Sequence, residues 1–274
     1  MAPLYTKTLV TGATSGIGEA LAAKLLEEGT SVIVTGRRQD RLNAFLAKHG
    51  GGNGEASAAA AVLDVARLDD LPDFAADLVR DHPDLDSVVL NAGVQRAFDF
   101  AQPAAVDLAA FGAELTTNYL AAVHLVTALL PHLQRRGRPA HLVFVGASLG
   151  LVPTLLRTPG YNASKAALHS WVVTLRQQLR AAGDPVRVVE VFPPAVQTEL
   201  HDAKHQPDLV NGGALGMPLP AYIEQMYAGL EKGADQFAIG PAAEWLESGF
   251  EKERQAVFER LHPVVTKSLE PYLK

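Results

Sequence analysis

The sequence predicts an α/β protein with a doubly wound parallel sheet of about seven strands and helices on both faces. Two patterns predict this fold. Short apolar runs alternate with amphipathic segments of about ten or more residues, which is typical of parallel βαβ units. The apolar runs are also near-continuous rather than alternating, as expected for strands that helices cover on both faces.

Predicted strands and helices follow one another in regular order. Strands are predicted at Lys7–Thr11, Ser31–Thr35, Ala58–Leu63, Ser87–Leu90, His141–Val145, Val186–Phe192 and Asp235–Ile239. Helices are predicted at Ile17–Glu28, Asp40–His49, Asp69–Arg80, Asp107–Arg135, Tyr161–Ala181 and Ala221–Lys232. Gly29 ends the first helix, and the glycine-rich stretch His49–Gly54 predicts a flexible turn after the second.

The chain is interpreted as one domain with a C-terminal extension. Residues 1–240 form the main domain, and residues 241–274 form a mainly helical extension of it. His201–Pro220 is long, polar and rich in glycine and proline, and loops of this kind are usually functional. We therefore expect a substrate lid near residues 199–220.

The composition excludes several functional classes. The chain has no cysteine, which excludes disulfides, thiolate catalysis and cysteine metal sites. The formal net charge of −6 does not suggest a nucleic-acid partner. The first residues lack the pattern of a targeting segment, and no apolar stretch is long enough to span a membrane. We expect a cytoplasmic protein with no membrane partner.

A glycine-rich turn, TGATSGIG at Thr11–Gly18, joins the first strand to the first helix. Gly12 permits a tight turn, Gly16 lets the backbone approach a pyrophosphate, and Gly18 allows close packing of helix and strand. The helix N-terminus then offers unpaired N–H groups to phosphate. The turn predicts Rossmann-type nucleotide binding by Gly12, Thr14, Ser15, Gly16, Ile17 and Gly18.

The end of the second strand indicates which nucleotide is bound. Arg37 and Arg38 stand there, and no acidic residue occupies the place that would bind the ribose of NAD. We therefore predict that NADP(H) is preferred and that NAD(H) is possible, the alternative being two solvated arginines at a helix start. Asp64, followed by Val65, ends the third strand and either binds the adenine amino group or caps the next turn.

A second motif predicts acid–base chemistry. Tyr161 and Lys165 are four residues apart at the start of a long predicted helix, so they share one face. The charge of Lys165 is expected to lower the pKa of the Tyr161 phenol, which is otherwise too weak an acid near neutral pH. Ser148 lies just beyond the fifth strand, where its hydroxyl could bind a carbonyl oxygen.

Taken together, these motifs resemble the short-chain dehydrogenase/reductase family. Thr11–Gly18 matches its TGxxxGIG motif and Tyr161–Lys165 its YxxxK motif. Further matches, in family order, are Asn91, Ala92 and Gly93 (the NAG motif), Asn118, Ser148, Pro193 and Thr198. Pro194 replaces the usual glycine. The segments NAGVQR, LRQQL, PPAVQTEL and Met217-Pro218-Leu219 are similar to the branch of D-alanyl-lipoteichoic-acid-operon-type oxidoreductases, in which the double proline is common.

The resemblance implies an NADP(H)-dependent oxidoreductase that interconverts a ketone or aldehyde and an alcohol by hydride transfer. It makes Tyr161 the general acid/base, with Ser148 orienting the carbonyl, Lys165 holding the nicotinamide ribose and Asn118 holding a water that connects Lys165 to solvent. It also assigns Asn91, Ala92, Gly93, Pro193, Val196 and Thr198 to the cofactor site.

Substrate, partners and alternative functions are less narrowly defined by the residues. Gln95, Leu149 and Leu155 are expected at the substrate pocket beside Ser148 and Tyr161, although the leucines also suit a core or interface. No metal site is expected. Family members commonly pair their long helices, so a homodimer or homotetramer is predicted. The alternatives are a catalytically weak nucleotide-binding scaffold or sensor, and a non-redox cyclase or isomerase.

Overall fold

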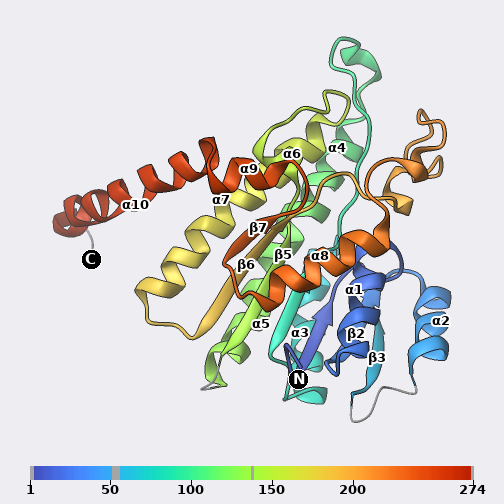
Figure 1. Cartoon of the computed structure of the whole chain (residues 1–274), viewed down its shortest axis with the longest axis horizontal. Helices are drawn as coiled ribbons and strands as arrows, with labels where there is room; N and C mark the ends of the chain where they lie inside the picture. Colours follow the sequence, from blue (N-terminus) through green and yellow to red (C-terminus); the bar gives the residue numbers. More distant parts are fainter. Residues whose placement is uncertain (1–2, 51–55, 137–138, 273–274) are drawn as a thin grey trace.

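The computed structural model describes residues 3–50, 56–136 and 139–272, and it confirms a doubly wound parallel sheet (Figure 1). Most of the turn predicted at His49–Gly54 lies outside the described residues. Within them, seven parallel strands run in the order β3-β2-β1-β4-β5-β6-β7. These strands are β1 (Lys7–Val10), β2 (Ser31–Gly36), β3 (Ala58–Val62), β4 (Ser87–Leu90), β5 (Ala140–Val145), β6 (Val186–Phe192) and β7 (Gln236–Ala238).

Two helical layers cover the sheet. The α-helices are α1 (Gly16–Glu27), α2 (Gln39–His49), α3 (Leu71–Asp81), α4 (Leu108–Leu115), α5 (Ala121–Arg135), α6 (Ser148–Leu151), α7 (Pro159–Ala181), α8 (Leu219–Glu231), α9 (Ala242–Glu247) and α10 (Phe250–Leu269). Leu9, Val88 and Phe144 pack with α3, α5 and α7 in one core, while their strand neighbours Val10 and Val89 pack with α1, α2 and α8 in the other. Burial on both faces explains why the strands lack polar alternation.

The strand order fixes where a ligand can bind. β1 pairs with both β2 and β4, with Leu9 opposite Ile33 on one side and Val88 on the other. The chain therefore leaves β1 in one direction and later returns to its other side. A crevice opens at such a switch in strand order, outside the carboxyl ends of the strands.

The helix predicted at Asp107–Arg135 differs in its interior. Asp107 caps α4 by accepting a hydrogen bond from the Ala110 N–H at 2.9 Å. A single π-helical turn at Thr116–Leu120 then separates α4 from α5. Such turns insert one extra residue into a helix and are frequent at functional sites. This one contains Asn118, whose side chain is buried.

The segment predicted as a loop also gains structure that the sequence did not indicate, whereas the C-terminal extension is mainly helical, as expected. The predicted loop His201–Pro220 contains 3₁₀ turns at Glu199–His201 and Gly212–Ala214, and α8 begins at Leu219. The C-terminal extension forms α9, α10 and a final 3₁₀ turn at Glu270–Tyr272. No helix in residues 3–50, 56–136 and 139–272 is long and apolar enough to cross a membrane.

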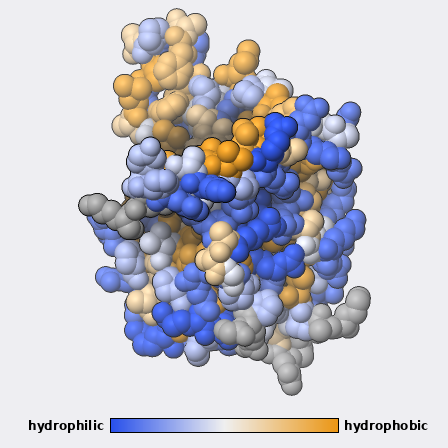
Figure 2. All heavy atoms as spheres, turned by 90° about the vertical axis from the view of Figure 1, so that its left-hand side faces the viewer, coloured by the Kyte–Doolittle hydropathy of each residue, from blue (hydrophilic) through white to orange (hydrophobic). Residues whose placement is uncertain are grey.

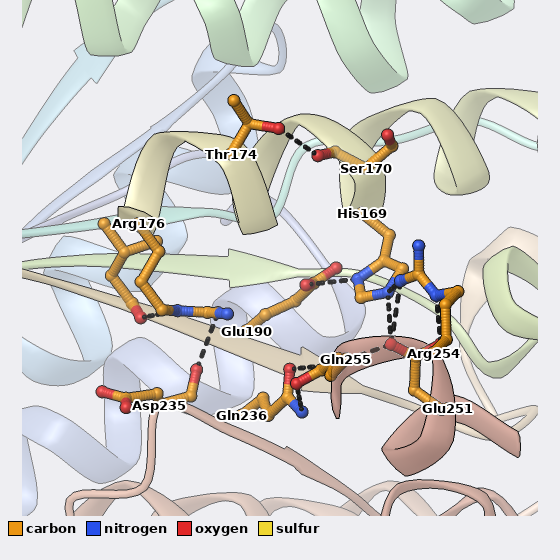
Figure 3. A network of polar contacts seen from close by, with 11 residues as sticks. His169, Ser170, Thr174, Arg176, Glu190, Asp235, Gln236, Glu251, Arg254 and Gln255 are labelled. Carbon is orange, nitrogen blue, oxygen red and sulfur yellow. Dashed lines mark hydrogen bonds and ion pairs between the residues drawn. The ribbon is translucent and has the colours of Figure 1, made fainter. Parts of the chain in front are cut away.

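A buried charge network attaches α10 to the centre of the fold (Figure 3). His169 of α7 contacts the Glu190 carboxylate of β6 through Nδ1 at 2.8 Å and the Glu251 carboxylate of α10 through Nε2 at 3.1 Å. Arg254 donates to Glu251 through Nε at 2.8 Å. Burial alone would lower the pKa of His169, but both carboxylates outweigh it and raise this pKa to about 9. The two carboxylates therefore favour the cationic form of His169 at neutral pH, although the Arg254 guanidinium also contacts its Nε2.

This network predicts a pH-dependent stability. Because the folded-state pKa of His169 lies above its unfolded value, its stabilisation is complete below about pH 6.5 and is lost as the pH rises through 9. Chemical unfolding of the wild type between pH 6.5 and 9 is expected to show a loss of up to about 1.4 kcal/mol per pH unit from this group. The double variant His169→Gln/Glu190→Gln removes both charges of the pair and should lack this component. Parallel stability curves for the two proteins would contradict the assignment.

Candidate active site

The glycine-rich turn after β1 packs so closely against its neighbours that a side chain would not fit at its glycines. Gly12 and Gly16 have φ values of +65° and +59°, a region that suits glycine. A Cβ on Gly12 would lie 2.7 Å from the Ala92 Cα, and one on Gly18 would lie 2.5 Å from the Gly12 carbonyl oxygen. Asn91 braces the turn, since its Nδ2 donates to the carbonyl oxygens of Thr11 and Gly12 at 3.0 and 3.2 Å.

This turn has the features needed to hold a dinucleotide pyrophosphate. It leads into the N-terminus of α1, where Ser15 occupies the cap position without using its side chain as a cap. The first N–H groups of the helix and its dipole therefore point to the crevice at the strand ends. A helix N-terminus combined with close backbone approach is a general arrangement for phosphate binding. The residues present thus fit a dinucleotide.

The two arginines predicted to select the cofactor behave differently. Arg37 is exposed, whereas Arg38 folds back over the turn, donating through Nε to Thr14 Oγ1 at 3.1 Å and through Nη2 to Ser15 Oγ at 2.7 Å. Its Nη1 donates to Glu199, a residue that the sequence analysis missed, at 2.7 Å. The structure therefore brings Arg38, and not Arg37, to the glycine-rich turn.

Asp64 and Val65 lie two and three residues beyond the end of β3. Asp64 Oδ1 accepts a hydrogen bond from the Ala66 N–H at 3.1 Å, which is the turn-capping alternative. Val65 is buried in the core. The adenine contact of Asp64 stays a prediction.

The first turns of α7 place Tyr161 and Lys165 beside each other. Pro159 starts this helix, and the exposed fractions of Tyr161 and Lys165 are 9% and 4%. Lys165 Nζ lies 5.7 Å from the centre of the Tyr161 ring and donates to the Val145 carbonyl oxygen at 2.7 Å. The spacing of four residues therefore produces the predicted shared site.

Ser148 is held near this pair by α6. Its N–H donates to the Pro193 carbonyl oxygen at 3.0 Å. A Cβ on Gly150, two residues later, would lie 2.8 Å from the carbonyl carbon of Lys165, so α6 packs directly on the backbone of α7. The structure thus places α6, which begins at Ser148, against the helix that carries Tyr161 and Lys165.

The pKa values of the pair differ from the sequence expectation. Burial raises the pKa of Tyr161, and the charge of Glu114 raises it further, so the expected lowering by Lys165 does not dominate. Burial lowers the pKa of Lys165 to about 8, although the Glu190 carboxylate opposes this shift. Lys165 can therefore exchange a proton close to neutral pH.

Glu114 of α4 is a further candidate that the sequence analysis missed. It is fully buried, and its Oε1 accepts a hydrogen bond from the Arg96 N–H at 3.2 Å. Its Oε2 is buried without a hydrogen-bond partner, and a Cβ on Gly160 would lie 2.8 Å from that atom. Burial raises the pKa of Glu114 to about 7. A carboxyl group in the apolar segment LAAFGAEL was the available signal.

Asn118 uses its amide to hold neighbouring segments. Oδ1 accepts from the Val94 N–H at 2.8 Å, and Nδ2 donates to the Val94 carbonyl oxygen at 2.9 Å and to Ser164 Oγ at 3.0 Å. A small cavity nearby is lined by Asn118 and Lys165 together with Thr117. Asn118 and Lys165 thus line the same small cavity, and the water between them stays a prediction.

The segment after β6 closes over the glycine-rich turn. The nearest Thr198 side-chain atoms would lie 3.2 Å from a Cβ on Gly16. Further along, Gln206 Nε2 donates to Gln95 Oε1 at 2.7 Å, and both side chains are buried. Val196 is buried and forms a parallel bridge with Met217. The predicted Gln95 therefore contacts the lid segment.

Several exposed apolar side chains lie in the segments that follow β5 and β4. Leu149 and Leu155 are half-buried, while Leu156 is 86% exposed. The loop between β4 and α4 carries exposed Phe100, and Leu108 follows it at the start of α4. Figure 2 shows apolar atoms on the lobe that stands highest in both views, which Figure 1 identifies as this loop. Among the described residues, no group of three or more His, Asp or Glu side chains could hold a metal.

Comparison with known proteins agrees with this geometry. The family model for short chain dehydrogenases matches residues 6–208. The chain is 33% identical over 254 residues to the uncharacterized oxidoreductase DltE of Bacillus subtilis, covering 93% of this chain and 95% of that protein. It is 35% identical over 194 residues to sulfoacetaldehyde reductase 2 of Chromohalobacter salexigens, covering 70% and 73%.

Solved structures show the same fold. A short-chain dehydrogenase from Sphingobium yanoikuyae in complex with NADPH aligns with a TM-score of 0.78 and 22% identity, over 92% of this chain and 95% of that one. The similarity to DltE also agrees with the branch of D-alanyl-lipoteichoic-acid-operon-type oxidoreductases that the sequence motifs indicated. The chain belongs to the short-chain dehydrogenase family of oxidoreductases.

Proposed function

We propose that this protein is an NADP(H)-dependent oxidoreductase that interconverts a ketone or aldehyde and the corresponding alcohol. The observation that carries the proposal is the burial of Tyr161 and Lys165 side by side, with α6 packed on their helix and with Thr11 and Lys165 lining one small cavity. The named relative sulfoacetaldehyde reductase 2 supports an aldehyde or ketone substrate. The contacts of Arg38 at the turn favour NADP(H) over NAD(H), which stays possible.

The cofactor supplies or accepts the hydride. In this proposal the Ser148 hydroxyl donates to the carbonyl oxygen and orients it. Tyr161 Oη then gives its proton to that oxygen during reduction and recovers it during oxidation. Loss of the phenol proton from Tyr161 is unfavourable because burial disfavours the phenolate. Lys165 favours this step in two ways: its positive charge stabilises the phenolate, and its pKa of about 8 lets it pass on a proton.

The remaining segments have supporting roles in the proposal. Residues 1–240 form the catalytic domain, and residues 199–220 act as the lid, with Gln206 fastening it to Gln95. Residues 241–274 extend this domain, and Glu251 ties the extension to α7. Asn91, Ala92, Gly93, Pro193, Val196 and Thr198 line the cofactor side. A homodimer or homotetramer through the long helices stays a prediction.

Replacing the proposed acid tests the chemistry. Tyr161→Phe removes the proton of the phenol while keeping its ring, so turnover should fall by about 100-fold or more. NADPH affinity, followed by nicotinamide fluorescence, should change by less than about twofold because the hydroxyl is not needed to hold the dinucleotide. Tyr227→Phe, in the other core, is the matched control. Full activity of Tyr161→Phe would contradict the proposal.

A carbonyl and alcohol panel separates the proposal from its alternatives. Substrate-dependent oxidation of NADPH by the wild type is the expected result. Tight NADPH binding without turnover would favour a scaffold or sensor. Product formed without net change in the redox state of the cofactor would instead indicate a cyclase or isomerase.

Glu114 gives the reaction a predicted pH dependence. Because the charge of Glu114 raises the pKa of Tyr161, Glu114→Gln should lower the apparent pKa that governs alcohol oxidation. The pH profile of kcat/KM is the measurement, with Glu244→Gln of α9 as a control that also removes one carboxylate. An unchanged or upward-shifted profile would show that Glu114 does not act on the phenol.

A further inference from the structure

A carboxylate from a distant part of the chain occupies the cationic corner of the glycine-rich turn. Glu199 directly follows Thr198 after β6, yet its Oε2 accepts a hydrogen bond from Arg38 Nη1 at 2.7 Å. Its Oε1 lies 3.4 Å from Arg41 Nη2. Ser15 at the N-terminus of α1 also bonds Arg38, at 2.7 Å. An internal anion thus contacts two guanidinium groups beside a helix N-terminus.

Glu199 is ionised in this position. Burial alone would raise its pKa, but the hydrogen bond and charge of Arg38 outweigh burial and hold the pKa of Glu199 below its usual range. The side chains of Arg38 and Glu199 are each 31% exposed, so the pair is partly shielded from solvent. The negatively charged carboxylate of Glu199 therefore contacts Arg38 at neutral pH.

The cluster has the chemistry of a phosphate site. Guanidinium groups bind phosphate through paired hydrogen bonds, and Thr14 and Ser15 add hydroxyls. A ribose 2′-phosphate would bring a charge of about −1.5 to −2 and three acceptor oxygens to this place. Arg38 cannot fully serve both that phosphate and Glu199, because two anions would then share one guanidinium.

We infer that Glu199 is a resident anion of the 2′-phosphate site and that it sets the selectivity between NADPH and NADH. The inference rests on the proposed NADP(H) function. NADPH must displace Glu199 from Arg38, which weakens its binding. NADH brings ribose hydroxyls instead, and a carboxylate accepts hydrogen bonds from these groups. Glu199 therefore weakens the binding of NADPH and is compatible with the binding of NADH.

The variant Glu199→Gln keeps the shape of the side chain and removes its charge. Dissociation constants for NADPH, NADH and 2′,5′-ADP are measured by calorimetry on the full chain, together with the control Glu224→Gln. Glu224 also pairs with a cation, Lys24 at 3.3 Å, but its partner is not Arg38. Glu199→Gln should lower the dissociation constants for NADPH and 2′,5′-ADP by about tenfold, a coupling typical of linked sites. The dissociation constant for NADH should change by less than about twofold or should rise. Glu224→Gln should change none of the three dissociation constants.

The outcomes separate this inference from the proposed function. NADPH binding by the wild type, with no gain in Glu199→Gln, would overturn the inference alone. Weaker NADPH binding by Glu199→Gln would also overturn it, because Glu199 would then position Arg38 for the phosphate. Equal tightening of NADPH and NADH would show a general charge effect and overturn the selectivity role. Failure of all three proteins to bind NADPH and 2′,5′-ADP would overturn the proposed function as well.

Discussion

The close approach of the glycine-rich turn to the end of β4 is the constraint on which the site depends. Gly12 lies against Ala92 with no room for a side chain, and Asn91 holds the carbonyl oxygens of the turn. The contact is possible because β1 and β4 are neighbours in the sheet although many residues separate them in sequence. It brings the turn that leads into α1 against residues 91–94, to which Asn118 is hydrogen-bonded. One backbone contact therefore helps to position both the proposed cofactor site and the proposed proton-transfer site.

Buried charge is the second organising feature, and it forms a chain of contacts from β6 through α7 to α10. Lys165 is buried among few compensating groups, with Glu190 the carboxylate whose charge reaches it. Glu190 is in turn held by His169, and His169 by Glu251 of α10. Removing one member of such a buried group is costly because an uncompensated charge remains. The C-terminal extension thus contributes to the electrostatic surroundings of α7, the helix that carries Lys165, although it is distant in sequence.

The sequence predicted the fold, and it indicated the glycine-rich turn and the Tyr161–Lys165 pair, because the patterns that identify them are local. TGATSGIG and the Tyr161–Lys165 spacing each lie within one turn or helix, and the apolar runs identify the strands. The π turn at Thr116–Leu120 has no such signal, because the same apolar spacing suits a continuous α-helix until Asn118 is fixed to Val94. The pKa of Tyr161 was predicted in the wrong direction, since burial depth is a tertiary property that spacing does not give.

The sequence did not indicate Glu114 and Glu199 either, because both act through contacts between distant parts of the chain. The two residues differ in where these contacts lie. Glu114 sits inside the packed interface of α4 and α7, so its effect on Tyr161 is present whenever the chain is folded. Glu199 follows Thr198 at the start of the proposed lid, and its partner Arg38 follows β2, which is far from β6 in the order of the sheet. On our inference, an anion that takes Arg38 from Glu199 would also break one contact between the proposed lid and the glycine-rich turn, while Thr198 would stay packed against Gly16. Competition at Arg38 would then couple cofactor choice to the contacts of the proposed lid, through a single charge and without a second binding site.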